Sequence, residues 1–274
     1  MAVLRHEVKK HPLLLFLHGL GESGDSEDPL GMFDPDTVGL VPYLLGGFNM
    51  GVDRHTFRPS SNSVTLKCPK VLSEKFFVLC PRTPCVNVRE AWQAKEIDSF
   101  MTAFMEDASK KLSVGEAPLR NYIDQQRLYV TGCSMGGLGS FRAAETGWFA
   151  AAAPVCSART VVDHARVFEN GCKVWAFHGA NDRMCPCEFT DGAMEPLLEA
   201  LTPAPPQPDP VLQCDAVTYR DDPTSSDAAY QYTRYSRTPD CDDVPGDGHA
   251  AWIPAYQNPT LYEWFLLWSK KAAL

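Results

Sequence analysis

The feature that most constrains this chain is the regular alternation of short apolar runs with longer segments of helical periodicity. Most of the apolar runs are nearly continuous, which is typical of parallel strands that are covered on both faces. Elsewhere apolar side chains recur at helical spacing, as at Trp92, Ile97 and Phe104. The predicted strands are Pro12–Leu17, Phe76–Cys80, Leu128–Thr131, Ala150–Val155, Val174–Phe177 and Tyr230–Tyr235, and the predicted helices are Arg89–Leu112, Gly136–Thr146, Asp191–Leu201 and Pro259–Ala273. This order predicts an α/β fold, a doubly wound, mostly parallel sheet with helices on both faces.

We expect one domain over residues 1–274, because no segment has the character of a linker between two cores. A length of 274 residues is ordinary for a single α/β domain. Two segments, at about 22–75 and 202–244, depart from the alternation, and we interpret them as loop insertions. The second begins with TPAPPQPDP, in which prolines fix φ and remove backbone donors, so it must start as an extended loop.

The charge and hydropathy of the chain exclude two classes of partner. The net charge is −9, whereas a protein that binds nucleic acid through its phosphates needs clustered Lys and Arg. The run Leu13–Leu17 follows basic residues, as in a signal peptide, but it is short and no small-residue cleavage site follows it. No run approaches the roughly 20 apolar residues of a membrane span. We therefore expect neither a nucleic-acid partner nor a membrane span.

Ten cysteines are many for a chain of this length. Most fall in predicted core segments, as at Cys80, Cys133, Cys156 and Cys172, where a free cysteine behaves as a small buried hydrophobe. Without a secretory segment, this usage predicts reduced thiols and a cytoplasmic protein. A C-x-C pattern occurs at 185–187, but no second pair at zinc-site spacing accompanies it, so we expect no metal and no cofactor.

The stretch VTGCSMGGLG carries the first chemical signal, a G-x-S-x-G pattern centred on Ser134. A predicted strand precedes it and a predicted helix follows it. A strand-to-helix turn this tight needs glycines beside the serine, and it exposes the serine hydroxyl at the N-terminus of the helix. That terminus offers free N–H groups and a favourable dipole for negative charge. We predict that Ser134 is a nucleophile, and that its neighbour Cys133 points back into the sheet.

A serine hydroxyl becomes a good nucleophile only when a base takes its proton. The loop after the strand KVWAF contains Asp182, and the glycine-flanked segment VPGDGHAAW contains His249 after the last predicted strand. The chain order Ser134, Asp182, His249 is the order in which such an elbow serine is followed by its acid and base. Each residue alone is a weak signal, but three successive strand exits together predict a catalytic triad.

Three other aspartates compete with Asp182 for the role of the acid. Asp191 precedes a helical pattern and is expected to be its N-cap. Asp163 follows a different strand. Asp247 is too close in sequence to His249 to reach the far nitrogen of its ring. Asp182 is therefore the predicted acid.

An acyl transfer also needs donors for a developing oxyanion. The glycines of LFLHGLGESG expose backbone amides after the first strand, so we predict an oxyanion hole from the N–H groups of Met135 and Leu20. His18 is expected to hold this loop by hydrogen bonding. Trp92 and Trp252 are candidate substrate-binding residues, although such apolar aromatic residues are more often part of the core.

These motifs together resemble the α/β-hydrolase superfamily, and within it the esterase and phospholipase/carboxylesterase-like serine hydrolases. The chain is similar to polyhydroxybutyrate depolymerase-like and feruloyl esterase-like enzymes and more distantly to acyl-protein thioesterases. The matching segments are LFLHGLGESG at 15–24, FFVLCP at 76–81, VTGCSMGGLGSF at 130–141, AAAAPVCS at 150–157, FHGANDRMCP at 177–186 and GHAAW at 248–252. The resemblance implies an α/β-hydrolase fold and an ester-cleaving activity, and it does not specify the substrate.

We therefore expect a serine hydrolase, a carboxylesterase-like enzyme that cleaves small-molecule carboxylic esters, with thioesters as a second substrate class. A serine peptidase of the same fold and a non-catalytic binding protein are the alternatives. Acidic side chains in both insertions predict a polar pocket rim that favours short or compact acyl groups over long chains. These side chains are Asp25, Glu27, Asp28, Asp34 and Asp36 in the first insertion, and Asp215, Asp221, Asp222 and Asp227 in the second. Nothing in the sequence indicates an oligomeric state.

Overall fold

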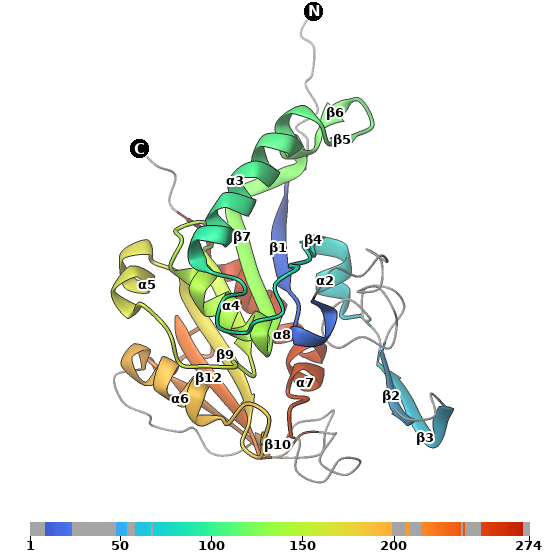
Figure 1. The fold of residues 1–274 in the computed structure, drawn as a ribbon, viewed down its shortest axis with the longest axis vertical. Coiled ribbons are helices and arrows are strands. Elements are labelled where there is room, and N and C mark those ends of the chain that lie inside the picture. The colour runs from blue at the N-terminus through green and yellow to red at the C-terminus, as the bar shows by residue number, and fades with distance from the viewer. Residues whose placement is uncertain are drawn as a thin grey trace, which may run out of the picture.

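A single mixed sheet organises the molecule and has the predicted architecture. The computed structural model describes residues 9–23, 48–53, 58–66, 68–198, 207–208, 215–236, 238 and 248–270. Among these residues, eight strands form one sheet in the order β10-β11-β12-β9-β8-β7-β1-β4 (Figure 1). The strands are β1 (His11–Leu17), β4 (Phe77–Leu79), β7 (Ile123–Cys133), β8 (Ala151–Val155), β9 (Lys173–Gly179), β10 (Gln207–Pro208), β11 (Asp215–Arg220) and β12 (Tyr230–Tyr235).

The strands from β4 to β12 in this order all run parallel, so their carboxyl ends lie at one edge of the sheet. The pairing of Leu17 with Gly132, of Cys133 with Val155 and of Tyr235 with Gly179 aligns these ends. We call this side the carboxyl edge and the opposite side the amino edge. The loops that follow β1, β7, β8, β9 and β12 therefore leave the sheet at the same edge.

Helices cover both faces of the sheet, as predicted (Figure 1). Alternate side chains of β1 face opposite ways, since Leu13 and Leu15 pack in one hydrophobic cluster and Leu14 and Phe16 in another. The first cluster includes side chains of α3 (Ala94–Lys110), α4 (Met135–Ala144), α5 (His164–Asn170) and α6 (Glu188–Met194). The second includes side chains of α2 (Lys70–Lys75), α7 (Trp252–Gln257) and α8 (Pro259–Leu267). This is a doubly wound α/β fold.

Helix boundaries differ from the predicted ones where the backbone is specialised. The helix predicted from Arg89 begins at Ala94, because Trp92 has a φ of 54° and Gln93 forms a capping box with Glu96. The helix predicted from Asp191 begins earlier, at α6, and continues after Met194 only as the 3-10 turn η4 (Glu195–Leu197), which contains a proline. Asp191 is therefore inside α6 and is not its N-cap.

Short elements occupy parts of the chain that were predicted as loops. β2 (Phe48–Asp53) and β3 (Arg58–Leu66) form a separate antiparallel hairpin within the first insertion. β5 (Ser113–Val114) pairs with β6 (Ala117–Pro118), and the 3-10 turn η3 (Leu119–Tyr122) leads into β7. The 3-10 turn η1 (Leu20–Glu22) follows β1. The remainder of the 22–75 insertion lies mostly outside the described residues.

The acidic residues of the second insertion do not lie where the sequence suggests. β11 runs antiparallel to β12, which is parallel to β9, so the turn between β11 and β12 lies at the amino edge. Asp221, Asp222 and Asp227 are exposed in this turn. The prediction that they border the pocket at the carboxyl edge is therefore wrong. Asp215, at the start of β11, does lie at the carboxyl edge, and the predicted acidic side chains over 25–36 lie outside the described residues.

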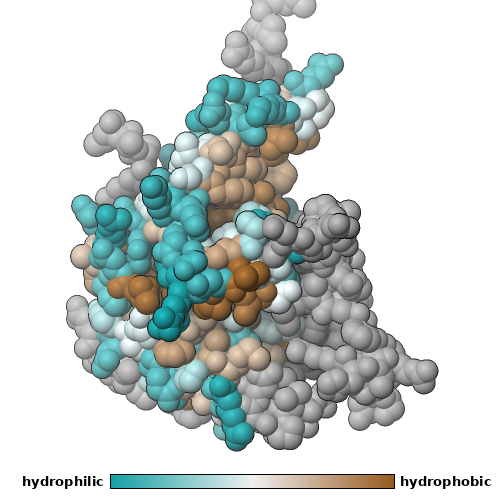
Figure 2. All heavy atoms as spheres, viewed as in Figure 1, coloured by the Kyte–Doolittle hydropathy of each residue, from teal (hydrophilic) through white to brown (hydrophobic). Residues whose placement is uncertain are grey.

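The surface mixes polar and apolar side chains. Figure 2 shows one face on which hydrophilic side chains surround small groups of exposed hydrophobic ones. Among the described helices, none combines the length and the apolar character that would be needed to cross a bilayer. Two of the exposed large hydrophobic residues, Leu20 at 44% and Met184 at 62%, belong to loops of the carboxyl edge.

Candidate active site

Ser134 stands at the turn between β7 and α4 in a conformation that few non-glycine residues adopt. Its φ is 60° and its ψ is −115°. The glycines on either side allow two backbones to approach closely. A Cβ atom at Gly132 would lie 2.4 Å from the carbonyl oxygen of Leu17, and one at Gly136 would lie 1.9 Å from the same oxygen. The turn is thus fixed against the end of β1, and it leaves Ser134 half-buried at the N-terminus of α4.

Cys133, the rival nucleophile, lies on the other side of the backbone. Its side chain is buried, with 5% exposed, in the cluster formed with α7 and α8. The thiol of Cys156 lies beside it. Its position agrees with the prediction that residue 133 packs in the core.

Asp182 and His249 are brought together directly. The Oδ2 atom of Asp182 lies 2.7 Å from Nδ1 of His249. Asp182 follows β9 and is 6% exposed, whereas the His249 side chain, after β12, is 13% exposed. Two backbones make this approach possible, since Gly248 has a φ of 60° and a Cβ there would lie 2.3 Å from the carbonyl oxygen of Asn181. The loop that carries the histidine therefore packs on the loop that carries the acid.

The carboxylate of Asp182 accepts four hydrogen bonds. Its Oδ1 atom accepts from the backbone N–H groups of Met184, at 3.0 Å, and Cys185, at 2.8 Å. Its Oδ2 atom lies within reach of His249 and, at 3.1 Å, of Nε2 of His178. Burial raises the pKa of Asp182, but the hydrogen bonds from the two histidines and the backbone outweigh it and lower this pKa to about 2. The acid is therefore ionised at neutral pH.

Ser134 joins this cluster through Cys185. The Oγ atom of Ser134 lies 4.0 Å from Sγ of Cys185, whose backbone N–H binds Asp182. On the other side, the thiol of Cys156 donates to the carbonyl oxygen of His249 at 3.3 Å. Burial raises the pKa of the Cys156 thiol well above its ordinary value, so the thiol keeps its proton. The three predicted residues Ser134, Asp182 and His249 thus lie in one group of loops at the carboxyl edge.

The loop after β1 lies against the serine turn. A Cβ at Gly19 would stand 3.8 Å from the Cβ of Ser134. The buried His18 fixes this loop, because its Nε2 accepts from the N–H of Thr83 at 3.1 Å and its Nδ1 lies 2.7 Å from the carbonyl oxygen of Gly19. Burial lowers the pKa of His18, which favours this neutral form. Leu20 follows in η1, and Met135 is the first residue of α4, so the chain segments that bear both predicted oxyanion donors border the serine.

The two tryptophans that were candidate substrate-binding residues are largely buried. Trp92 is 7% exposed, and its Nε1 donates to the carbonyl oxygen of His18 at 3.1 Å. Trp252 is 1% exposed in the cluster beneath α7 and α8. These positions support a packing role for both indoles, and a contact of either with substrate stays a prediction.

Sequence reasoning did not assign a role to His178, which stands in the quoted segment FHGANDRMCP. It is completely buried, and its ring contacts Asp182, the carbonyl oxygen of Cys185 and the hydroxyl of Thr190. The sequence signal for His178 is its spacing of four residues from Asp182, because a tight turn at the end of a strand brings residues at this spacing close together.

One group of side chains at this edge has the composition of a metal site. Ligand atoms of Cys156, His178 and Asp182 lie within 4.8 Å of one another, and all three side chains are buried. The same atoms already form the hydrogen bonds that hold the acid and the His249 loop. Cys187, from the C-x-C pattern, instead accepts from Nη2 of Arg234 at 3.2 Å. We assign the group to support of the acid.

The eight cysteines that the structure describes have free thiols. They are Cys68, Cys80, Cys85, Cys133, Cys156, Cys172, Cys185 and Cys187. Cys214 and Cys241 lie outside the described residues.

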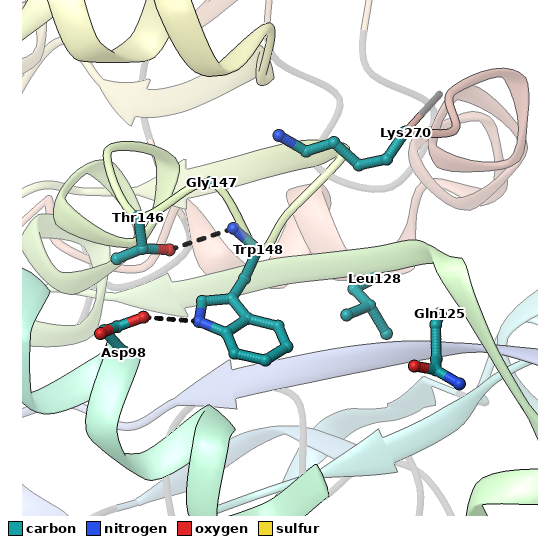
Figure 3. Close-up of a pocket in the computed structure, with 7 residues that line it drawn as sticks. All are labelled: Asp98, Gln125, Leu128, Thr146, Gly147, Trp148 and Lys270. Atoms are coloured by element: carbon teal, nitrogen blue, oxygen red, sulfur yellow. Dashed lines mark hydrogen bonds between the residues drawn. The ribbon is translucent and has the colours of Figure 1, made fainter. Parts of the chain in front are cut away.

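A pocket of about 490 Å³ lies at the amino edge, far along the strands from Ser134 (Figure 3). Leu128, in the middle of β7, forms one wall. Trp148, before β8, forms another, and its Nε1 donates to Asp98 of α3 at 2.8 Å. The backbone N–H of Lys270 donates to the carbonyl oxygen of Gln126, which brings the end of the described chain to this pocket. None of the predicted site residues lines it.

Of the comparisons with known proteins, the one with solved structures bears on the fold. No protein-family model and no curated protein sequence matches the chain. Among solved structures, a thermostable esterase is similar, with a TM-score of 0.58 and 22% sequence identity over 98% of this chain. The chain spans 58% of the length of that esterase. Together with the strand order and the serine turn, this similarity identifies the architecture as the α/β-hydrolase fold.

Proposed function

We propose that the chain is a serine hydrolase that cleaves carboxylic esters through Ser134, His249 and Asp182. The single observation that carries this proposal is the strained Ser134 turn at the carboxyl edge, in the same loop group as a 2.7 Å contact between Asp182 and His249. Backbone strain of this kind costs free energy and persists where the surrounding structure enforces it, as at the reactive turns of enzymes. The resemblance of this chain to esterases, in sequence motifs and in fold, supports the same reaction class.

In the proposed reaction, His249 is the general base. Its Nδ1–H donates to the ionised Asp182, which leaves Nε2 as the nitrogen that takes the proton of Ser134. The Oγ atom then attacks the ester carbonyl carbon, and the backbone N–H groups of Met135 and Leu20 stabilise the oxyanion. His249 passes the proton to the leaving alcohol as the C–O bond breaks, and an acyl-enzyme remains. Water attacks this acyl-enzyme with His249 again as base, which releases the acid and restores Ser134.

We further propose that short or compact acyl groups are preferred, in esters and in thioesters. The Sγ atom of Cys185 stands 4.0 Å from the Ser134 hydroxyl, and the backbone of Cys185 is held by Asp182 and His178, so this thiol narrows the space next to the reacting carbon. A series of p-nitrophenyl esters from acetate to palmitate, at one ionic strength, tests this preference. A kcat/KM maximum at or beyond the laurate ester would contradict it.

A fluorophosphonate probe tests the reaction class directly. The wild-type chain is expected to be labelled, and Ser134→Ala is expected to lose labelling together with hydrolysis of p-nitrophenyl acetate. Cys133→Ala is the matched control, because it removes the adjacent rival nucleophile and should keep both. Labelling of Ser134→Ala at the wild-type rate would show that another residue is the nucleophile.

A further inference from the structure

His178 and His249 both contact the same oxygen atom of Asp182. The Nε2 atom of His178 lies 3.1 Å from Oδ2, and the Nδ1 atom of His249 lies 2.7 Å from it. The two histidines come from different elements, β9 and the loop after β12. The proposed triad accounts for His249 only, so the second imidazole on the acid needs an explanation of its own.

The neighbours of His178 determine its protonation state. Its Nε2 atom faces two acceptors, Oδ2 of Asp182 and the carbonyl oxygen of Cys185 at 2.7 Å, so this nitrogen must carry a proton. Its Nδ1 atom lies 2.7 Å from Oγ1 of Thr190, a hydroxyl that can donate to it. A ring with a proton on Nε2 fits all of these contacts. The buried ring is thus a fixed donor toward the acid.

The donors around Asp182 indicate the role of the proton on Nε2 of His178. A carboxylate offers about four lone-pair positions. Two backbone N–H groups, those of Met184 and Cys185, bind Oδ1, and the two imidazoles bind Oδ2. Removal of the His178 proton would leave Oδ2 with His249 as its one donor from this set. The carboxylate would then be held by three donors instead of four, and more of its negative charge would act on His249.

We propose that His178 is a positioning residue, which holds Oδ2 of Asp182 toward His249 and, by sharing its charge, sets the pH range in which His249 acts as a base. This inference rests on the proposed function. His178 acts through Asp182 and does not need to touch the substrate. Thr190 supports the same arrangement of hydrogen bonds, since it fixes which nitrogen of His178 carries the proton.

Other titratable and charged groups surround this pair of histidines. Arg234 of β12 lies in register with His178, but it pairs with Asp191 of α6 at 3.4 Å, so part of its charge is neutralised locally. Cys156 is a buried thiol whose pKa is raised by burial, so it stays uncharged. The titratable and charged groups that the structure relates to this site are His249, Arg234, Asp191, Cys133, Cys156, Cys185 and Glu22.

Two substitutions of His178 separate positioning from packing. His178→Leu fills the site but removes the donor, whereas His178→Gln offers an N–H at a comparable distance from the backbone. We expect His178→Leu to lower kcat/KM for p-nitrophenyl acetate by roughly 10- to 100-fold, as loss of hydrogen-bond partners behind functional histidines does. Because Asp182 would then attract the His249 proton more strongly, the acid limb of the pH profile should move to higher pH, by roughly half a unit or more. His178→Gln should recover most of both effects.

Two further variants make the result independent of folding and of general disturbance. Thr190→Val removes the partner of Nδ1 and should give a smaller shift in the same direction, even if His178→Leu does not fold. His164→Leu is the matched control: its ring also hydrogen-bonds at α6, with 2.8 Å between Nε2 and the carbonyl oxygen of Ala193, but it does not contact Asp182. Its pH profile should equal that of the wild type.

A measurement without turnover separates this inference from the proposed function. The ring signals of His249 can be titrated by NMR in Ser134→Ala and in the double variants that add each His178 substitution. A higher titration midpoint with His178→Leu, recovered by His178→Gln, supports the positioning role even if no ester is hydrolysed. Unchanged midpoints and pH profiles in His178→Leu and Thr190→Val, with only a loss of thermal stability, would overturn it.

Discussion

The two edges of the sheet differ in how their polar groups are held. At the carboxyl edge, His18, His178 and Asp182 are buried, and their ring nitrogens or carboxylate oxygens have short polar contacts. At the amino edge, a roomy pocket is bordered by Trp148 and Lys270 and contains no comparable buried cluster among the described residues. Among the described residues, the prepared polar geometry is thus at the carboxyl edge.

This difference shows that a fixed polar geometry distinguishes the candidate site. Buried polar groups lower stability unless every one of them has a partner. At the carboxyl edge, several buried polar groups have partners and lie next to a strained serine. Such an arrangement lowers the free energy of unfolding, and packing alone would not require it.

The largest effect is expected from Asp182→Asn. The amide would keep its oxygen toward the backbone N–H groups of Met184 and Cys185, so its NH₂ group would face His249 and His178. His249 would then have to present the unprotonated Nδ1, the wrong tautomer for a base. Turnover of p-nitrophenyl acetate should fall by up to about 10⁴-fold, as in the known serine triad.

The control for this change is Asp163→Asn. Asp163 is the N-cap of α5, and its side chain accepts from the N–H of Arg166, so the variant should lose at most about 1 kcal/mol of stability and keep its turnover. If Asp163→Asn were the inactivating change and Asp182→Asn were mild, the acid would be misassigned.

The candidate site residues were predictable where a short stretch of sequence carries the motif. The serine turn follows from a strand, two glycines and a helix within one short stretch. The acid and the histidine follow from their positions after predicted strands. The sheet itself was predictable because most of its buried strands are nearly continuous apolar runs.

Features that depend on pairing between distant segments were not predictable. The acidic turn at Asp221 was placed at the wrong edge, because the direction of β11 is set by its pairing with β12. The start of α3 depends on the positive φ of Trp92, whose indole is held by a carbonyl group 74 residues earlier. The role of His178 depends on Thr190 and on Asp182 and is visible only when all three side chains are placed.

The next largest effect is expected from the substitution of a glycine, and it is an effect on the free energy of unfolding. Gly136→Ala would put a methyl group 1.9 Å from the carbonyl oxygen of Leu17, a backbone atom that cannot turn away. The serine turn must then move, and we expect a loss of about 3 kcal/mol or more in the free energy of unfolding. Gly21→Ala is the matched control from the neighbouring loop, since its Cβ meets nothing within 4 Å and its cost should stay within about 0.5 kcal/mol. Chemical denaturation of both variants measures the difference, and equal losses would contradict the close packing at the turn.

Low pH should lower the free energy of unfolding through protonation of Asp182. Its pKa is about 2 in the folded protein, below the value near 3.9 of an unfolded aspartate, so the ionised form stabilises the fold. This contribution is fully present above pH ~4 and is lost as the pH falls toward 2, and it amounts to about 2 kcal/mol. The free energy of unfolding, measured between pH 5 and 2 at constant ionic strength, should fall less steeply in Asp182→Asn than in the wild type. Parallel curves would mean that the folded protein does not favour the ionised acid.

The smallest effects are expected from substitutions of two tryptophans that each donate one hydrogen bond. Trp92 lies near the carboxyl edge and Trp148 near the amino edge. Trp92→Phe would leave the carbonyl oxygen of His18 without this buried donor, which costs about 1–3 kcal/mol and loosens the loop that carries Leu20. Trp148→Phe removes a bond to an exposed Asp98 carboxylate that water can replace, so its cost should stay below about 1 kcal/mol. Because the first loop borders Ser134 and the second residue does not, kcat/KM for p-nitrophenyl acetate should drop several-fold in Trp92→Phe and stay at the wild-type value in Trp148→Phe. Thermal unfolding and kinetics of the two variants side by side test this, and a rate loss in Trp148→Phe that matches that of Trp92→Phe would mean that the amino edge also contributes to the reaction.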